Sequence, residues 1–485
     1  MDANLCLVTP TAITVVAYAR QVARHFIPRD PSHLFRGSLV SCMRTSVPPR
    51  IPRAIVTVAA VLFAGLDVGV VGAQLSPPGE NRQAFTLADA AALARRQHPL
   101  LSAASGRRLA ATGSARQDAA LPNPVFEWRK ENYGSPLPRD EFMSLGLPVD
   151  FYGRRVALRA ASGSAATRAR LDSSTTARDV EHDVARAYWQ AALAYALHDG
   201  AVAQRLAVDT IARIESERAR QGQVSNGSAM RARLEADRAR LAQSEARAAL
   251  ERTRGDLARA LATPFDSVPR PSQPLMAEVS REALPSLETL LTLARGRRSE
   301  LISAQARVYE TQRRQLAERL GTLPAVGVQV GSKRTSGFQT GTVQVGVAVP
   351  FFDRNGGNRQ RARGDLLVAE GDLRAVRSSV DAEVVSAFRA YRALLDEYDR
   401  SDDAGTADET LRTLDARGNT VAAIAAAAYR EGAIPLFELL DAERVRADVR
   451  SATLRAAAGV QMARADLLRA VGLPIDGARF QPIPQ

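Results

Sequence analysis

The sequence predicts a mainly α-helical protein in which long helical hairpins carry a pair of short β-hairpins. Three observations predict this fold class. Ala- and Arg-rich helical patterns run for tens of residues with few breaking residues. Four short stretches instead alternate apolar residues with polar or small ones, as strands do. Each feature occurs twice, about 200 positions apart, so the chain is a tandem repeat. Matching residues of the two copies are Leu87 and Leu287, Leu93 and Leu293, Arg95 and Arg295, Leu101 and Leu301, and Arg107 and Arg307.

Composition limits the possible partners. The chain has 485 residues and a formal net charge of +13. The basic residues are nearly all arginine, since Lys130 and Lys333 are the only lysines. These arginines alternate with Glu, Asp and Ala along the helices, a pattern typical of solvated helix faces with local ion pairs. We therefore expect no nucleic-acid partner.

The beginning of the chain has the layout of an export signal. Arginines within residues 44–53 precede an apolar run over 54–65, and a small-residue motif follows and ends at Ala73. The run is too short for a comfortable membrane span. We predict that residues 43–73 are a signal peptide cleaved after Ala73, and that residues 1–42 contribute nothing to the fold.

Candidate catalytic and metal-binding residues are few. Cys6 and Cys42 both precede the predicted cleavage point, so the mature chain would lack disulfides, thiolate metal sites, a catalytic cysteine and a lipid-anchor cysteine. Its histidines, His98, His182 and His198, have no metal-ligand spacing with acidic residues. We expect His182 and His198 to lie at the surface or between helices. No phosphate-binding loop occurs. We expect no catalytic, cofactor or metal site, and hence no enzyme.

The first repeat covers residues 74–263 and begins with a polar arm. Its helix over 153–221 would be roughly 100 Å long, more than a single globular core needs. Gly222 marks the turn that closes the helical hairpin. The predicted elements in order are a helix over 85–120, a strand around 126–128, a loop over 132–139, a strand over 143–147, a helix over 153–221 and a helix over 228–261.

A Pro-rich linker, residues 264–285, leads to the second repeat over 286–474, and residues 475–485 form a tail. Gly432 corresponds to Gly222 at an offset of 210 instead of 200, so we place a small insertion near 402–406. The predicted elements in order are a helix from 287 to Pro324, strands over 326–330 and 343–349 joined by a loop over 335–340, a long helix ending at Gly432, and a helix over 442–470.

The strands predict contact with a membrane. Four strands cannot close into a barrel alone, and open strand edges cannot lie in lipid because their backbone groups would be unsatisfied. Strands of roughly 9–11 residues with alternating faces suit a transmembrane barrel, so closure would need several copies of the chain. The alternative is a pair of soluble hairpins packed on the helices. On the barrel interpretation we expect the lipid-facing residues to be Phe126, Trp128, Val343, Val345 and Val347.

Two segments of the second repeat resemble a known family. The run Val-Pro-Phe-Phe-Asp-Arg-Asn-Gly-Gly over 349–357, the stretch from Tyr429 to Asp441 and the tandem repeat are similar to the TolC family of outer-membrane efflux factors. The first run is most similar to the heavy-metal and cation efflux branch. The resemblance covers about residues 85–474.

This resemblance implies an assembly and a function. It implies a homotrimer with a twelve-stranded barrel in outer-membrane lipid and a twelve-helix tunnel across the periplasm. It also implies docking to a periplasmic adaptor (membrane fusion) protein and to an inner-membrane pump of the RND or ABC type, which supplies the energy. The chain would be the passive exit duct for metal ions, drugs or other small molecules. The rival hypothesis is a soluble periplasmic helical scaffold or adaptor, which leaves the four strands unexplained.

The resemblance also assigns residues near the turns. Glu438 and Asp441 match acidic residues that line the narrow periplasmic aperture, and Tyr429 matches a tyrosine that latches the closed mouth. Ile434 and Ser228 depart from the family pattern, because they stand where some members have a latch arginine and its aspartate partner. The alternative for Glu438 and Asp441 is a solvated helix face, and for Tyr429 it is packing between helices.

The ends farthest from the strands are the expected adaptor-docking tips. They lie at the two helical turns. The residues assigned to the tips are Gly222, Val224, Gly432 and Ile434.

Overall fold

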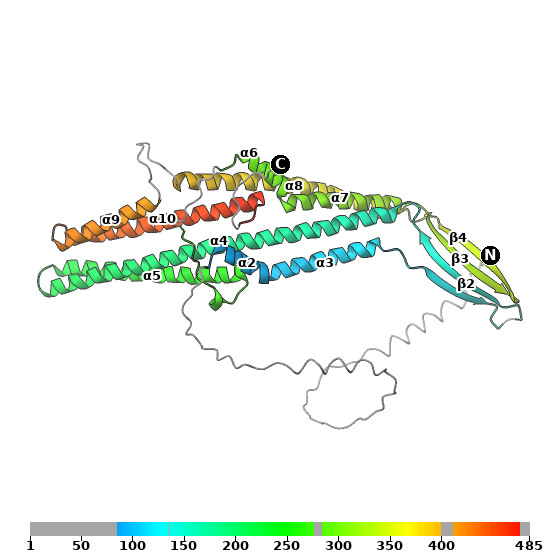
Figure 1. Ribbon diagram of the computed structural model, residues 1–485, viewed down its shortest axis with the longest axis horizontal. Helices are drawn as coiled ribbons and strands as arrows, with labels where there is room; N and C mark the ends of the chain where they lie inside the picture. The colour runs from blue at the N-terminus through cyan, green and yellow to red at the C-terminus, as the bar shows by residue number, and fades with distance from the viewer. Residues whose placement is uncertain (1–84, 135, 276–283, 399–410, 476–485) are drawn as a thin grey trace, which may run out of the picture. The chain divides into compact units, whose positions relative to one another are not determined.

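The computed structural model describes residues 85–134, 136–275, 284–398 and 411–475, all within one unit, Glu80–Gln485. It is mostly helical with one small antiparallel sheet (Figure 1). The predicted extension, signal peptide and insertion near 402–406, as well as residues 476–485 of the tail, lie outside the described residues.

The described elements of the two repeats correspond in order, except that the second repeat has two helices before its Gly turn where the first has one. The first consists of α2 (Leu87–Gln97), α3 (Pro99–Ala119), β1 (Val125–Glu131), β2 (Asp140–Val149), α4 (Arg154–Arg220) and α5 (Asn226–Leu261). A short 3-10 helix, η1 (Phe265–Ser267), follows in the predicted linker. The second consists of α6 (Leu287–Arg297), α7 (Ser299–Leu320), β3 (Ala325–Thr335), β4 (Phe338–Ala348), α8 (Gly356–Tyr398), α9 (Leu411–Arg430) and α10 (Leu436–Val471).

The predicted single helix over 85–120 is wrong. It is broken at His98, which is extended (φ −67°, ψ 125°) and whose Nδ1 accepts a hydrogen bond from the backbone N–H of Leu100 at 3.3 Å. Pro99 explains the break, because a proline disfavours the helical conformation of the residue before it. Arg298 has nearly the same backbone angles between α6 and α7, so both repeats bend at the equivalent position.

The predicted loop over 335–340 is also wrong. Only Ser336 and Gly337 lie between β3 and β4. Both residues have positive φ, 49° and 89°, as a two-residue hairpin turn requires. The strands therefore extend to the turn on both sides. The predicted long helix over 153–221 agrees with α4, and β1 and β2 end and begin at the bounds of the predicted loop over 132–139.

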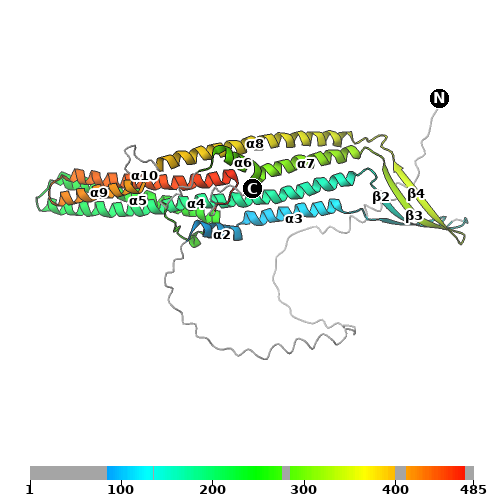
Figure 2. The same ribbon diagram turned by 45° about the horizontal axis from the view of Figure 1, so that its top comes forward.

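The four strands form one sheet in the order β1-β2-β3-β4, with every neighbouring pair antiparallel. Each repeat supplies one hairpin, and the pairing of β2 with β3 joins the two. Because α4 begins shortly after β2 and ends just before the turn at Gly222, the sheet and the helical turns lie at opposite ends of α4 (Figure 2). We call these the sheet end and the turn end.

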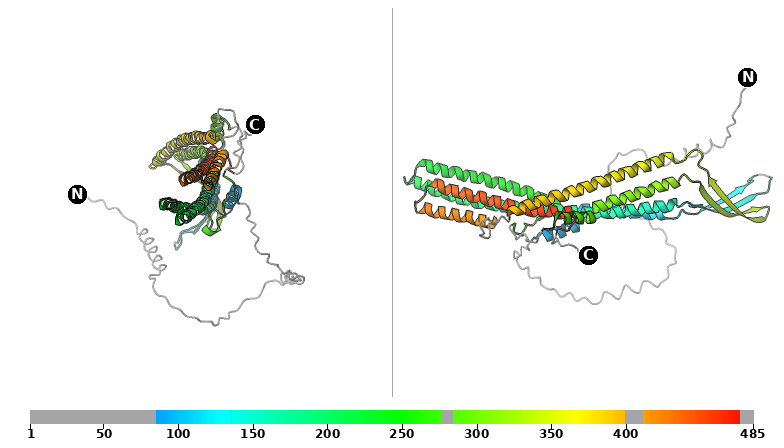
Figure 3. Two further views of the ribbon diagram at one scale, coloured as in Figure 1. Left: turned by 90° about the vertical axis from the view of Figure 1, so that its left-hand side faces the viewer. Right: turned by 90° about the horizontal axis from the view of Figure 1, so that it is seen from above.

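The hydrophobic core lies along the middle of the long helices, where α2 and α6 pack against them (Figure 3). Tyr188 of α4 is fully buried there, and its hydroxyl donates a hydrogen bond to the Phe85 carbonyl at 2.9 Å. A second cluster centres on Val384 of α8 and Leu467 of α10. Among the described residues no helix is long and apolar enough to cross a membrane.

Candidate functional site

The first candidate surface is one face of the sheet. Paired residues in neighbouring strands point to the same side, so the register defines cross-strand rows. These rows place most of the apolar residues of the four strands on one side, which we call the apolar face; Val125, Phe142 and Phe338 lie on the other side. The rows are Phe126, Leu145, Val330 and Val343; Leu147, Val328 and Val345; Val149, Val326 and Val347; and Trp128 with Met143.

The apolar face is open to its surroundings. Phe126 is 66% exposed, Val343 76% and Val345 60%, and Trp128 and Val347 are also exposed. Packing of the hairpins on the helices is therefore wrong for this face. The opposite face is mainly polar or small, as in the row of Glu127, Ser144, Gly331 and Thr342. A contiguous exposed apolar surface of this kind marks contact with another protein or with a membrane.

The second candidate surface is the turn end. Gly222 and Gly432 both have positive φ, 74° and 75°, as the predicted left-handed helix stops require. In both turns the residue after the glycine donates its N–H back into the last helical turn, from Gln223 to Arg218 and from Ala433 to Ala428, each at 2.9 Å. The two tips therefore have one geometry.

The remaining residues predicted for the tips and the aperture lie close to these turns. Val224 and Ile434 are half-buried at equivalent positions after the two glycines, whereas Glu438 and Asp441 lie exposed on α10. Neither acid pairs with the neighbouring arginines. Arg444 Nη2 instead contacts Glu235 of α5 at 2.8 Å.

A buried polar cluster links the two helical hairpins at the turn end. Its centre is Glu215 of α4, whose side chain is only 1% exposed. The Tyr429 hydroxyl of α9 donates a hydrogen bond to Glu215 Oε1, and Ser228 Oγ of α5 donates to Oε2 at 2.9 Å. Arg218 Nη1 donates to the Tyr429 hydroxyl at 3.1 Å and lies 3.6 Å from Glu215 Oε1.

Tyr429 is held in its protonated form. Burial, the hydrogen bond to Glu215 and the negative charge of that carboxylate together raise the pKa of Tyr429 to about 12. Its hydroxyl therefore remains a hydrogen-bond donor at neutral pH. Ser228, one of the two departures from the family pattern, thus supplies a donor to an acid on another helix.

Glu215 was missed by the sequence analysis, although a signal was present. Val208, Ala212 and Glu215 follow each other at helical spacings of four and three residues, and all three are buried. A charged residue within an apolar stripe marks a position where the charge has partners inside the fold. What the stripe does not reveal is which helix supplies those partners.

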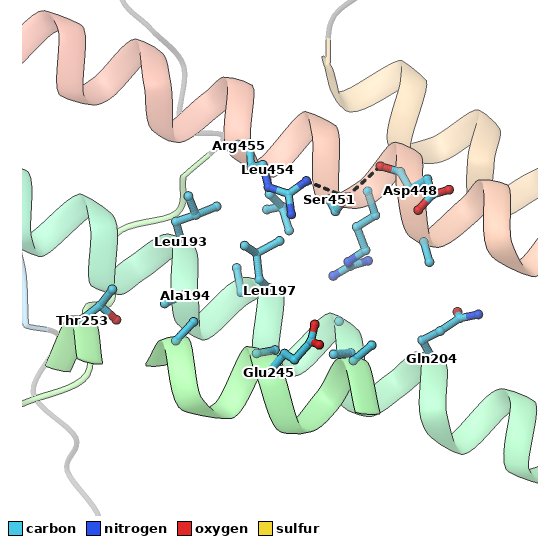
Figure 4. A pocket seen from close by; sticks show the side chains of 18 of the residues that line it. Leu193, Ala194, Leu197, Gln204, Glu245, Thr253, Asp448, Ser451, Leu454 and Arg455 are labelled. Atoms are coloured by element: carbon cyan, nitrogen blue, oxygen red, sulfur yellow. Dashed lines mark hydrogen bonds between the residues drawn. The ribbon is translucent and has the colours of Figure 1, made fainter. Parts of the chain in front are cut away.

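Between the sheet end and the turn end, a groove separates α10 from the hairpin of α4 and α5. It has a volume of about 670 Å³, and Leu193 and Leu197 of α4 face Leu454 of α10 across it (Figure 4). Toward the turns the gap is bridged by Arg446 Nη2, which donates to Gln204 Oε1 at 2.8 Å. Polar contacts therefore join the hairpins nearer the tips.

His182 lies between helices, as expected. Its Nε2 lies 2.6 Å from Asp466 Oδ1, which ties α4 to α10 together with Arg186. His198 is half-buried on α4 beside Asp199. Within the described part of the chain no group of three or more His, Cys, Asp or Glu side chains is placed to hold a metal ion.

The fold was compared with those of known proteins. No protein-family model matches the sequence, and no curated protein matches it. Solved structures do match. The outer-membrane protein VceC of Vibrio cholerae is 17% identical, with 80% of this chain and 97% of that chain covered at a TM-score of 0.65. The open state of the MtrE outer-membrane channel of Neisseria gonorrhoeae is 18% identical, with 80% and 89% covered at 0.65.

A structure of CusC, described in terms of transmembrane channel formation, is 17% identical, with 81% of this chain and 93% of that chain covered at a TM-score of 0.63. Each of these similarities covers most of this chain and most of the matched chain. The protein has the fold of outer-membrane channels, as the resemblance to the TolC family predicts.

Proposed function

We propose that the protein is the outer-membrane channel of a tripartite efflux or secretion system, a passive exit duct for metal ions, drugs or other small molecules. The observation that carries this proposal is the apolar face, because it is exposed, continuous across four strands and attached to a channel fold. A soluble periplasmic scaffold is not favoured, since this face would then contact water.

The dimensions of the sheet suit a membrane. The 11 residues of β4 extend about 37 Å at about 3.4 Å each. A strand tilted by about 40° would then span about 29 Å, close to the hydrocarbon thickness of about 30 Å. A polar face opposite the apolar face is what a water-filled lumen requires.

Closure of the barrel requires other copies of the chain. Within the described residues β1 and β4 are the edges of the sheet, and each has a neighbour on one side only. Pairing of β4 of one copy with β1 of the next would satisfy both edges without any new element. A homotrimer would then form a twelve-stranded barrel and, from its long helices, a twelve-helix tunnel.

The turn end would be the periplasmic mouth, because α4 carries it about 100 Å from the sheet. Glu438 and Asp441 would form rings of carboxylates at the aperture, and the buried cluster of Tyr429 would hold the hairpins together when the mouth is closed. The tips at Gly222, Val224, Gly432 and Ile434 would dock the periplasmic adaptor, which in turn contacts the inner-membrane pump.

Export is part of the proposal. A signal peptide over 43–73, cleaved after Ala73, would bring the chain to the periplasm and the outer membrane. The test is to express the full-length chain in a Gram-negative host and separate membrane, periplasmic and cytoplasmic fractions. We expect a heat-modifiable trimer in the outer-membrane fraction, whose mature N-terminus is Gln74. A soluble periplasmic monomer would overturn the proposal and support the helical scaffold.

A further inference from the structure

A pocket lies where the sheet meets the helices. It has a volume of about 350 Å³ and is formed by the end of β2, the segment after α3 and the first turns of α4. One wall is apolar and the other carries arginines. The residues used below are Leu121, Leu147, Val149, Arg155, Val156 and Arg159.

The apolar wall continues the apolar face of the sheet. Leu147 and Val149 belong to the cross-strand rows that contain Val345 and Val347. They are the last residues of β2 on that face before α4 begins. If the apolar face contacts lipid, the pocket therefore opens at the membrane surface nearest the helices, where lipid headgroups lie.

The acids that line the pocket are already engaged. Asp150 accepts hydrogen bonds from the backbone N–H groups of Arg154 at 3.2 Å and Arg155 at 2.6 Å. Asp118 accepts a hydrogen bond from Ser162 Oγ. Both carboxylates therefore have donors from the protein itself and do not need the arginines of the pocket.

The arginines remain available. Arg155 uses one amino group, Nη2, to donate to the Ala120 carbonyl, which leaves its other donors free to face the pocket. Arg159 is exposed, and among the described residues no hydrogen bond or ion pair engages its guanidinium group. Free guanidinium donors one helical turn apart match the oxygens of a phosphate group.

We propose that this pocket binds a glycerophospholipid of the membrane leaflet that faces the helices. Arg159 and Arg155 contact the lipid phosphate, and an acyl chain lies along Leu121, Leu147 and Val149. Basic pockets at the membrane surface bind anionic headgroups in this way. The inference rests on the proposed function, because it needs the apolar face to lie in lipid.

The test uses the full-length protein purified in detergent, incubated with dioleoyl phosphatidylglycerol or with dioleoylglycerol, which lacks the phosphate. Native mass spectrometry counts the bound lipids. Arg159→Gln should reduce retention of phosphatidylglycerol about tenfold, because it removes one charged hydrogen-bonding group. Retention of dioleoylglycerol should not change. Val156→Glu, which places a negative charge at an exposed position in the pocket, should also weaken only the phosphorylated lipid.

The matched control is Arg213→Gln, an exposed arginine near the other end of the same helix. It should bind both lipids as the unmodified chain does. Equal phosphatidylglycerol retention by Arg159→Gln and Arg213→Gln would overturn the lipid site. Displacement of the lipid by millimolar inorganic phosphate would also overturn it, since the pocket would then be a simple anion site. Failure of the unmodified chain to insert into vesicles would instead overturn the proposed function.

Discussion

The two ends of α4 place apolar and charged residues in opposite ways. At the sheet end, apolar side chains such as Val343 and Phe126 are exposed. At the turn end, a carboxylate, Glu215, is buried and bonded by residues of α5 and α9. The sheet end therefore needs an apolar surrounding that the single chain does not supply, whereas the turn end is satisfied within the chain. If the proposed function holds, substitutions at the sheet end should disturb membrane assembly, and those at the turn end should affect only the proposed periplasmic mouth.

The largest effect is expected for Val345→Arg. It places a charge on the apolar face and should cost about 2–4 kcal/mol per copy if the residue lies near the bilayer midplane. The fraction of heat-resistant trimer in outer-membrane extracts measures this cost. Gln344→Arg is the matched control, because Gln344, the neighbour of Val345 in sequence, lies on the polar face. Normal assembly of Val345→Arg together with failure of Gln344→Arg would mean that the faces are assigned the wrong way round.

Glu215→Ala tests the buried cluster. The hydroxyls of Tyr429 and Ser228 would lose their acceptor, at a cost of about 1–3 kcal/mol. Amide hydrogen exchange should become faster in the turn-end segments of α4, α5 and α9, and the conductance of the closed channel should rise. Trimer yield should not change. Glu217→Ala, an exposed acid on the same helix, is the control. The two variants behaving alike would show that the cluster does not hold the mouth.

Gly432→Val should distort one tip. A β-branched residue at φ 75° costs about 1–2 kcal/mol, because its Cβ approaches the following carbonyl. We expect faster proteolytic cleavage at this turn and weaker adaptor binding, with the barrel unchanged. Gly432→Asn is the control, since asparagine tolerates the left-handed conformation. Equal adaptor binding by both variants and the unmodified chain would exclude this tip from docking.

The contact of Asp466 with His182 and Arg186 predicts a small pH effect. Burial raises the pKa of Asp466, but the hydrogen bonds from His182 and Arg186 and their charges outweigh it, so the net pKa is lowered. The ionised carboxylate of Asp466 therefore stabilises the folded state above its unfolded-state pKa of about 3.9. This stabilisation is lost as the pH falls through the lower pKa that Asp466 has in the folded state.

The carboxylate is partly exposed, so the contribution should stay below about 1 kcal/mol. Thermal unfolding of the chain and of Asp466→Asn between pH 2.5 and 6 would measure it. The difference between the two should shrink at the acidic end, and a difference that grows there would contradict the assignment.

The smallest effect on stability is expected when Glu438 and Asp441 are both replaced by Ala, because both side chains are exposed. Their effect should be on conduction alone. In single-channel recordings at low salt, where screening is least, block by multivalent cations should weaken. Persistent block in this double variant would mean that the two carboxylates belong to a solvated helix face instead of the aperture.

Local features of the sequence determined much of the fold. The positions of Gly222 and Gly432 predicted both helix stops, because only the backbone of the residue itself has to adopt the left-handed conformation. Alternation around Phe126 and Val345 predicted which side of each strand is apolar. The break at His98 has a local signal in Pro99, whereas the equivalent break at Arg298 is followed by Ser299 and has no such signal.

The tertiary structure alone decided how distant segments meet. The pairing of β2 with β3 joins residues nearly 200 positions apart, and its register aligns most apolar residues of both hairpins on one face. The burial of Glu215 depends on α9, which carries Tyr429 more than 200 residues later. The pocket that contains Arg155 and Arg159 forms because α4 starts beside the end of β2. The periodicity of the sequence describes each helix or strand by itself. The burial and pairing of its residues depend on which other element packs against it, and the free energy of the whole fold determines that packing.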